Sequence, residues 1–276
     1  MSTLLLIDNG STRRESTLNL RRLAKALSDN IGRQVYPVSL MHSDRIAVTE
    51  LDGEAARIFE PFLIQRLSHG EREFIIVPLF FGPSRALTRF IPEQLSSLHK
   101  EFGPFSARVA KTLCPLPEGE IRLAGILYEN LLSTAEAEHI VIDRVILVDH
   151  GSPVAEVTAV REWIAAQLQR LLGSEIPLSE AVMERRSGSE YDFNGALLED
   201  VLRDLARKNP AQNVVLSMMF FSPGRHAGPG GDIEEIYRKI ETEYPGFRVF
   251  PTPLVGTHPD IIKILQDRLE QELKDT

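Results

Sequence analysis

The chain has 276 residues, 25% of them charged and 43% hydrophobic, which is ordinary for a globular protein and sufficient for two domains of average size. The net charge of −8 argues against general nucleic-acid binding, and the single cysteine excludes an intrachain disulfide or a metal cage of cysteines. Because the first apolar run lacks a basic leader and no apolar stretch is long enough to span a membrane, we expect a cytoplasmic protein without a nucleic-acid or membrane partner.

Short apolar runs alternate with amphipathic segments along the chain. Continuous runs such as Phe74–Val77 are typical of strands covered on both faces, and the spacing of Leu20, Leu23 and Leu27 places them on one helix face. The predicted strands are 3–7, 34–39, 73–79, 106–112, 144–149, 176–183, 213–219 and 247–252. Helices are predicted around 20–27 and 58–63, at about 119–134, and over 155–172, 195–208, 232–243 and 259–273. This order predicts an α/β fold with two tandem, doubly wound parallel-sheet domains.

The sequence contains an internal repeat. Residues 4–11 (LLLIDNGS) match 145–152 (VILVDHGS), and residues 80–86 (FFGPSRA) match 220–226 (FFSPGRH). The matched positions lie 141 and 140 residues apart, so the two matches share one register. A third match pairs ILYENL at 126–131 with ILQDRL at 264–269. We interpret the repeat as a gene duplication that produced two domains, residues 1–138 and 139–276.

Histidines distinguish the two halves. His150 and His226 of the second half align with Asn9 and Ala86 of the first. Because the carboxyl ends of parallel strands share one rim where ligands bind, we expect His150, His226 and Glu184, which ends the intervening strand, to lie near one another. Two imidazoles and a carboxylate suit a divalent metal. The alternatives are a loop-packing role for His150 and a solvated charge for Glu184.

The first-half counterparts are less suited to metal binding. His42 follows Met41 as Glu184 follows Met183, so we align His42 with Glu184 and expect it to be structural or peripheral to a ligand. His258 precedes the last helix and remains unassigned. The sequence lacks a phosphate-binding P-loop, a dinucleotide-binding G-x-G-x-x-G and a nucleophile elbow, so no nucleotide is expected. Phosphohistidine phosphatases carry Arg-His-Gly, whereas Asp149 precedes the histidine here.

The second half resembles the sirohydrochlorin chelatases of the cobalt and iron type, the class II chelatases. The resemblance rests on His150-Gly151-Ser152, Val182-Met183-Glu184, Ser222-Pro223-Gly224-Arg225-His226, Asp232-Ile233 and the segment Pro253–Pro259. The first half matches in scaffold but departs at Asn9, His42 and Ala86. The segment that includes Ser187–Tyr191 departs from the short form of the family.

This resemblance implies two chelatase-like domains, the first degenerate, and a chain that inserts a metal into sirohydrochlorin without ATP, in cobalamin or siroheme biosynthesis. Cobalt and iron are the implied metals, with nickel as a further candidate. It implies that His150, Glu184 and His226 hold the metal or accept protons. We expect the substrate's carboxylates to be bound by Arg225, Arg185, Arg186 and Ser152, together with Arg85 on a first half that forms the opposite wall of a cleft. Ser152 also stands where it can cap the following helix. Because the two halves are fused in one chain, a dimer is less necessary, and we expect a monomer. A non-catalytic tetrapyrrole or metal carrier remains the alternative.

Overall fold

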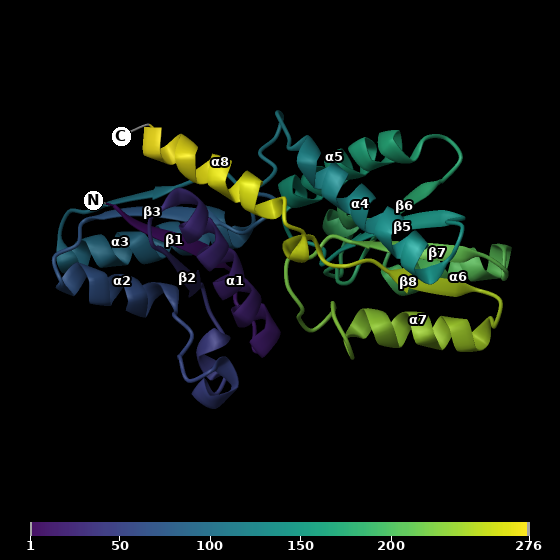
Figure 1. Ribbon diagram of the computed structural model, residues 1–276, viewed down its shortest axis with the longest axis horizontal. Helices are drawn as coiled ribbons and strands as arrows, with labels where there is room; N and C mark the ends of the chain where they lie inside the picture. The colour runs from purple at the N-terminus through teal and green to yellow at the C-terminus, as the bar shows by residue number, and fades with distance from the viewer. Residues whose placement is uncertain (1, 275–276) are drawn as a thin grey trace. The chain divides into compact units, whose positions relative to one another are not determined.

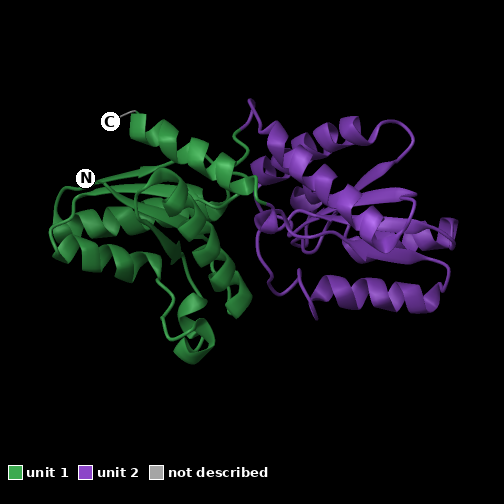
Figure 2. Cartoon of the chain, viewed as in Figure 1, with its two compact units in different colours: residues 1–115, 259–276 green, residues 116–258 purple. Residues whose placement is uncertain are grey.

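The computed structural model describes residues 2–274, which form two compact α/β units (Figures 1 and 2). Of the described residues, unit 1 combines 2–115 with 259–274, and unit 2 comprises 116–258. Within the described part of the chain, no helix combines the length and the apolar character needed to cross a membrane.

Each unit is built around a four-stranded parallel sheet. In unit 1 the order is β2 (Val35–Ser39), β1 (Thr3–Asp8), β3 (Glu73–Pro78), β4 (Ser106–Val109). In unit 2 it is β6 (Leu178–Val182), β5 (Arg144–Asp149), β7 (Asn213–Met218), β8 (Arg248–Pro251). The α/β class and the two parallel sheets are confirmed, and each predicted strand lies within three residues of its observed ends. In both sheets the chain order reverses beside the first strand, so the ligand-binding crevice is expected at the carboxyl ends of the strands.

Helices cover both faces of each sheet. Unit 1 contains α1 (Arg14–Ile31), α2 (Phe59–Ser68), α3 (Ile91–Phe102) and α8 (Ile261–Lys274). Unit 2 contains α4 (Ile121–Glu138), α5 (Ala155–Leu172), α6 (Leu198–Lys208) and α7 (Asp232–Glu243). Helices α2 and α3 share a core with one face of β1 and β3, and α6 and α7 share a core with the corresponding face of β5 and β7. Helix α3 is missing from the sequence-based prediction, although Ile91, Leu95 and Leu98 have helical spacing.

The last helix of each repeat packs in the unit that is built mainly from the other repeat (Figure 2). Helix α4 packs on α5 and β7 in unit 2, and α8 packs on α1 and β3 in unit 1. Buried Arg268 of α8 donates to the carbonyl oxygens of Thr112 (3.0 Å) and Leu113 (3.1 Å). The chain passes from one compact unit to the other after residues 115 and 258. The predicted boundary after residue 138 remains a proposal about where the two duplicated segments meet.

The first strands of the two sheets end in buried aspartates with different surroundings. Burial raises the pKa of Asp8 from 3.8 to about 6, against the opposing effect of hydrogen bonds from Ser39 and Gly10. Among the described residues, nothing donates to Oδ1 of Asp8. In unit 2, Asp149 pairs with Arg161 of α5 at 3.1 Å. Helices α1 and α5 begin 141 residues apart, so the counterpart of Arg161 in unit 1 is Leu20, which cannot pair with Asp8.

We expect Asp8→Asn to raise the free energy of unfolding at pH 7–8 by up to roughly 3 kcal/mol. A carboxyl whose pKa is higher in the folded than in the unfolded state contributes stability that is complete below about pH 4 and lost as the pH rises through about 6. Denaturant unfolding from pH 4 to pH 8 measures this difference, with the exposed Asp44→Asn as a control for the loss of one charge. An Asp8→Asn variant whose stability follows the wild-type pH dependence would contradict the prediction.

Candidate metal centre

Three predicted ligands come together at the carboxyl edge of the unit 2 sheet. His150 directly follows β5, Glu184 lies two residues beyond β6, and His226 lies in the loop between β7 and α7. Each offers one ligand atom, and these three atoms lie within 4.8 Å of one another. The two imidazole rings have centroids 4.8 Å apart and planes at 75°. Two neutral imidazoles and a carboxylate at this spacing suit a cobalt, iron or nickel ion.

A glycine allows the strand ends that carry His150 and Glu184 to approach each other. The Glu184 amide donates to the His150 carbonyl oxygen at 3.0 Å. Gly151 has a φ of 85°, and a Cβ atom there would lie 1.9 Å from the Glu184 carbonyl oxygen. Only glycine fits both the backbone conformation and this close contact.

The strand register corrects one sequence alignment. β1 pairs Asp8 with Ser39, and β5 pairs Asp149 with Val182. Met41 is therefore the counterpart of Glu184, so the alignment of His42 with Glu184 is wrong by one residue. The identical residues Met41 and Met183 produced the error. At the three positions that correspond to the cluster, unit 1 has Asn9, Met41 and Ala86, without an imidazole or a carboxylate.

His226 is held between two carboxylates. Its side chain is 6% exposed, its Nδ1 lies 2.8 Å from Oδ2 of Asp232, and its Nε2 lies 3.3 Å from Oε1 of Glu184. Burial, together with the neighbouring His150, lowers the pKa of His226 and favours the neutral ring at neutral pH. With Nδ1–H donating to Asp232, the lone pair of Nε2 faces the Glu184 carboxylate. Two acceptors at this separation repel each other unless a proton or a cation lies between them.

Asp232 had not been identified as a site residue from the sequence. It begins α7, six residues after His226, and its amide donates to the Arg225 carbonyl oxygen at 3.1 Å. The only sequence signal was its place in the Asp-Ile pair of the family pattern. A carboxylate that accepts from Nδ1 of a ligand histidine orients the ring and increases its basicity.

Of the predicted substrate-binding arginines, Arg225 is the one that joins the cluster. Its guanidinium contacts Glu184 (3.1 Å) and Asp232 (3.3 Å), and its side chain is 75% exposed. Arg185 pairs with Asp192 at 3.4 Å. The guanidinium of Arg186 lies 5.8 Å from the ring centroid of Tyr191, and exposed Arg85 belongs to unit 1.

Ser152 stabilises the turn before α5. Its hydroxyl accepts a hydrogen bond from the Val154 amide at 3.1 Å. Because Val154 is itself the residue at the N-cap position and its side chain makes no cap hydrogen bond, the expected capping role of Ser152 is wrong. The Ser152 hydroxyl instead closes the turn that leads from His150 into the helix.

A mostly apolar pocket of about 520 Å³ adjoins the His226 loop within unit 2. It is lined by Pro223 and Gly228 of that loop, by Ile233 and Tyr237 of α7, and by residues of β7 and the segment after β8, including Leu254. The lining comes from segments that are distant in the sequence, so no single motif indicates it. A concave, mostly apolar pocket is typical of a ligand-binding site.

The family model described as CbiX matches residues 144–272. No curated protein matches the chain. Among solved structures, SirB from Bacillus subtilis with Fe3+ is 15% identical, with a TM-score of 0.69 over 98% of this chain and 95% of that chain. The sirohydrochlorin chelatase SirB from Bacillus subtilis subspecies spizizenii in complex with cobalt is 15% identical over the same shares, with a TM-score of 0.67.

A third similar structure is CbiX, described as the terminal enzyme for biosynthesis of siroheme in denitrifying bacteria. It is 15% identical over 98% of both chains, with a TM-score of 0.60. These likenesses show that the fold extends across both units. The CbiX family model thus matches the part of the chain that contains the three clustered side chains, and the solved structures share the fold of the whole chain.

Proposed function

We propose that the protein inserts a divalent metal, cobalt or iron, into sirohydrochlorin without ATP, in cobalamin or siroheme biosynthesis. The observation that carries this proposal is the convergence of His150, Glu184 and His226, with Nε2 of His226 3.3 Å from a carboxylate oxygen of Glu184. The match of residues 144–272 to the CbiX family model and the similarity in fold to a sirohydrochlorin chelatase in complex with cobalt support it.

The chemistry requires groups that hold a metal and groups that accept protons. As the metal ion enters the macrocycle, two pyrrole N–H bonds break, two metal–nitrogen bonds replace them, and two protons are released. We expect Glu184 and His226 to accept these protons, with Asp232 stabilising the imidazolium form of His226. Three protein ligands leave coordination positions open, so the ion can be transferred from the protein to the substrate.

Arg225 is the strongest candidate for binding the substrate. Its guanidinium is exposed, yet it lies beside two carboxylates of the cluster. A peripheral carboxylate of sirohydrochlorin could form a charge-assisted pair with it, while an apolar part of the macrocycle occupies the pocket beside the His226 loop. Arg185, Arg186 and Ser152 remain proposed contacts farther along the same edge.

Arg85 provides a separate test of the proposed contribution of the first half. It aligns with Arg225 and is exposed. We expect Arg85→Ala to weaken sirohydrochlorin binding by about 10-fold or more, since a charge-assisted contact contributes roughly 1.5–3 kcal/mol, and to leave Co²⁺ affinity unchanged. Calorimetric titration of both ligands measures this. Arg14→Ala, which removes another exposed arginine of unit 1, is the control. Unchanged tetrapyrrole affinity in Arg85→Ala would exclude the contact.

A multiple-turnover assay tests the function. Purified protein is mixed anaerobically with excess sirohydrochlorin and Co²⁺, Fe²⁺ or Ni²⁺, and the absorption of the metal-free macrocycle is followed against the spontaneous rate. We expect many equivalents of product per protein with cobalt or iron and no effect of added ATP. Conversion of at most one equivalent would identify a carrier. The molar mass from light scattering checks the proposed monomer.

A further inference from the structure

A buried polar network lies beneath the turn that carries His150, and the proposed chemistry makes no use of it. Asn194, at the end of a short helical segment Ser189–Asn194, is fully buried. Its Oδ1 accepts from the Ser152 amide at 2.9 Å, and its Nδ2 donates to the Ser152 carbonyl oxygen at 2.8 Å. A side chain 42 residues away in sequence thus holds both backbone polar groups of Ser152.

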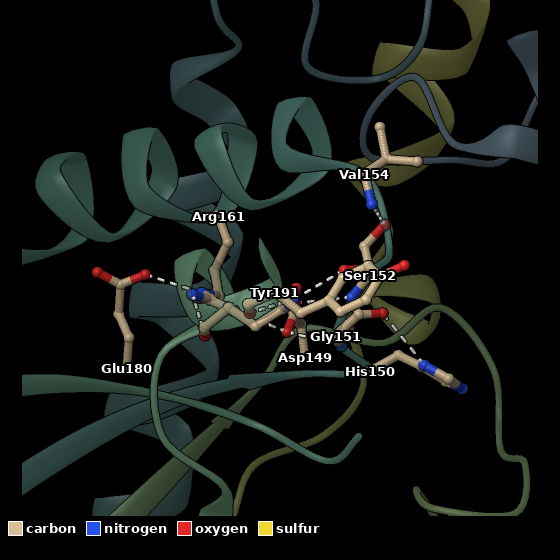
Figure 3. Close-up of polar contacts among 9 residues, drawn as sticks. Asp149, His150, Gly151, Ser152, Val154, Arg161, Glu180 and Tyr191 are labelled. Atoms are coloured by element: carbon tan, nitrogen blue, oxygen red, sulfur yellow. Dashed lines mark hydrogen bonds and ion pairs between the residues drawn. The ribbon is translucent and has the colours of Figure 1, made fainter. Parts of the chain in front are cut away.

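The first of these hydrogen bonds acts on His150 through one peptide plane. The amide of Ser152 and the carbonyl group of Gly151 belong to the same planar unit, so fixing one fixes the other. Nδ1 of His150 lies 3.3 Å from the Gly151 carbonyl oxygen (Figure 3). A carbonyl oxygen only accepts, so this contact favours the proton on Nδ1 and leaves Nε2 with the lone pair that a metal binds.

Arg161 of α5 connects the members of this network. It is 2% exposed, and its guanidinium donates to the Asn194 carbonyl oxygen (2.9 Å) and to the carboxylates of Asp149 (3.1 Å) and Glu180 (2.8 Å). Asp149 in turn accepts from the Gly151 amide at 3.0 Å (Figure 3). The peptide groups on both sides of Gly151 are therefore held by the side chains of Asp149 and Asn194, and Arg161 contacts both of these residues.

Unit 1 shows which part of this arrangement accompanies the histidine. There the hydroxyl of Ser43 contacts the amide and the carbonyl oxygen of Ser11, the counterpart of Ser152, at 3.3 and 3.2 Å. Leu20 stands in place of Arg161 and is buried. In both units, therefore, a side chain forms hydrogen bonds with the backbone of the serine in this turn. The shorter hydrogen bonds with an asparagine side chain, and the arginine that supports it, occur in the unit that carries His150.

We propose that Asn194, supported by Arg161, is a positioning residue that fixes the Gly151–Ser152 peptide and so holds His150 in the Nδ1–H tautomer with Nε2 free for the metal. The inference rests on the proposed function for its catalytic consequence. The tautomer and the binding of Co²⁺ are properties of the protein alone and can be measured without the tetrapyrrole.

The test compares Asn194→Ala with Ser43→Ala, which removes the corresponding hydrogen bonds to Ser11 in unit 1, where Asn9 takes the place of His150. Nitrogen-15 spectra of the histidine-labelled protein without metal report the tautomer of His150, which is assigned by its absence in His150→Ala. We expect the Nδ1–H form in the wild type and a shift toward the Nε2–H form in Asn194→Ala. Titration with Co²⁺, followed by its visible absorption bands, should show 10–100-fold weaker binding in Asn194→Ala and a change below twofold in Ser43→Ala.

Two further variants distinguish failure of the positioning role from failure of the proposed function. Asn194→Ser supplies a hydroxyl like that of Ser43 and replaces Asn194→Ala if the latter fails to fold; we expect it to give an intermediate Co²⁺ affinity. His150→Ala tests the metal site itself, and if it binds Co²⁺ as tightly as the wild type, the proposed function loses its basis. If His150→Ala weakens binding while Asn194→Ala or Asn194→Ser retains the wild-type tautomer and affinity, the positioning role is overturned and the proposed function stands.

Discussion

Replacing His226 by alanine should slow metal insertion by at least about 100-fold, the size of effect expected when a group that transfers a proton is removed. His226 is the buried member of the cluster, and a carboxylate oxygen lies within 3.3 Å of each of its ring nitrogens. Without it, Glu184 loses its imidazole neighbour but keeps the contact with Arg225, and the proposed metal site loses a ligand. The initial rate with sirohydrochlorin and Co²⁺ measures the effect, with thermal unfolding as a check on the fold.

Asn9→Ala is the matched control for His150→Ala, because Asn9 occupies the corresponding position after β1 in unit 1 and is also exposed. We expect Asn9→Ala to retain activity within a few-fold and His150→Ala to lose activity as His226→Ala does. An Asn9→Ala variant as impaired as His226→Ala would show that catalysis is not confined to unit 2.

Arg161→Leu should lower the free energy of unfolding at pH 7 by about 3–5 kcal/mol, although leucine is the residue at the corresponding place in unit 1. The substitution removes a buried cation that contacts two carboxylates and leaves Asp149 without its ionic partner. Burial already raises the pKa of Asp149, against the opposing charge of Arg161, so the unpaired carboxylate becomes more costly to ionise. Urea unfolding monitored by circular dichroism measures the loss.

A double-mutant cycle identifies the origin of that loss. Asp149→Asn in the Arg161→Leu background removes the unpaired carboxylate, so the double variant should recover part of the lost stability. Arg268→Leu provides a second comparison, because Arg268 is also a buried arginine but donates to backbone carbonyl groups in unit 1. An Arg161→Leu variant within about 1 kcal/mol of wild type would show that the ion pairs contribute little.

Local sequence patterns determined the secondary structure and its repetition. Apolar runs such as Val214–Leu216 are buried on both faces of a parallel sheet, and this burial requires the residue types by which the strand is recognised. The same reasoning located His150 and His226, because a residue that follows a parallel strand lies at the carboxyl edge whatever the remaining packing. The asymmetry between the halves was also visible, since it requires only the alignment of two segments.

Tertiary structure decided which distant groups meet. Helices α4 and α8 carry equivalent apolar faces, and such a face does not specify which of two similar sheets it covers, so their exchange between units had no signal in the sequence. The register that matches Glu184 with Met41 depends on strand pairing rather than on residue identity. Asn194 reaches Ser152 across 42 residues, and Asp232 meets His226 only because a loop returns to the start of α7. Hydrogen bonds between such segments depend on distance and angle in three dimensions, which local periodicity does not encode.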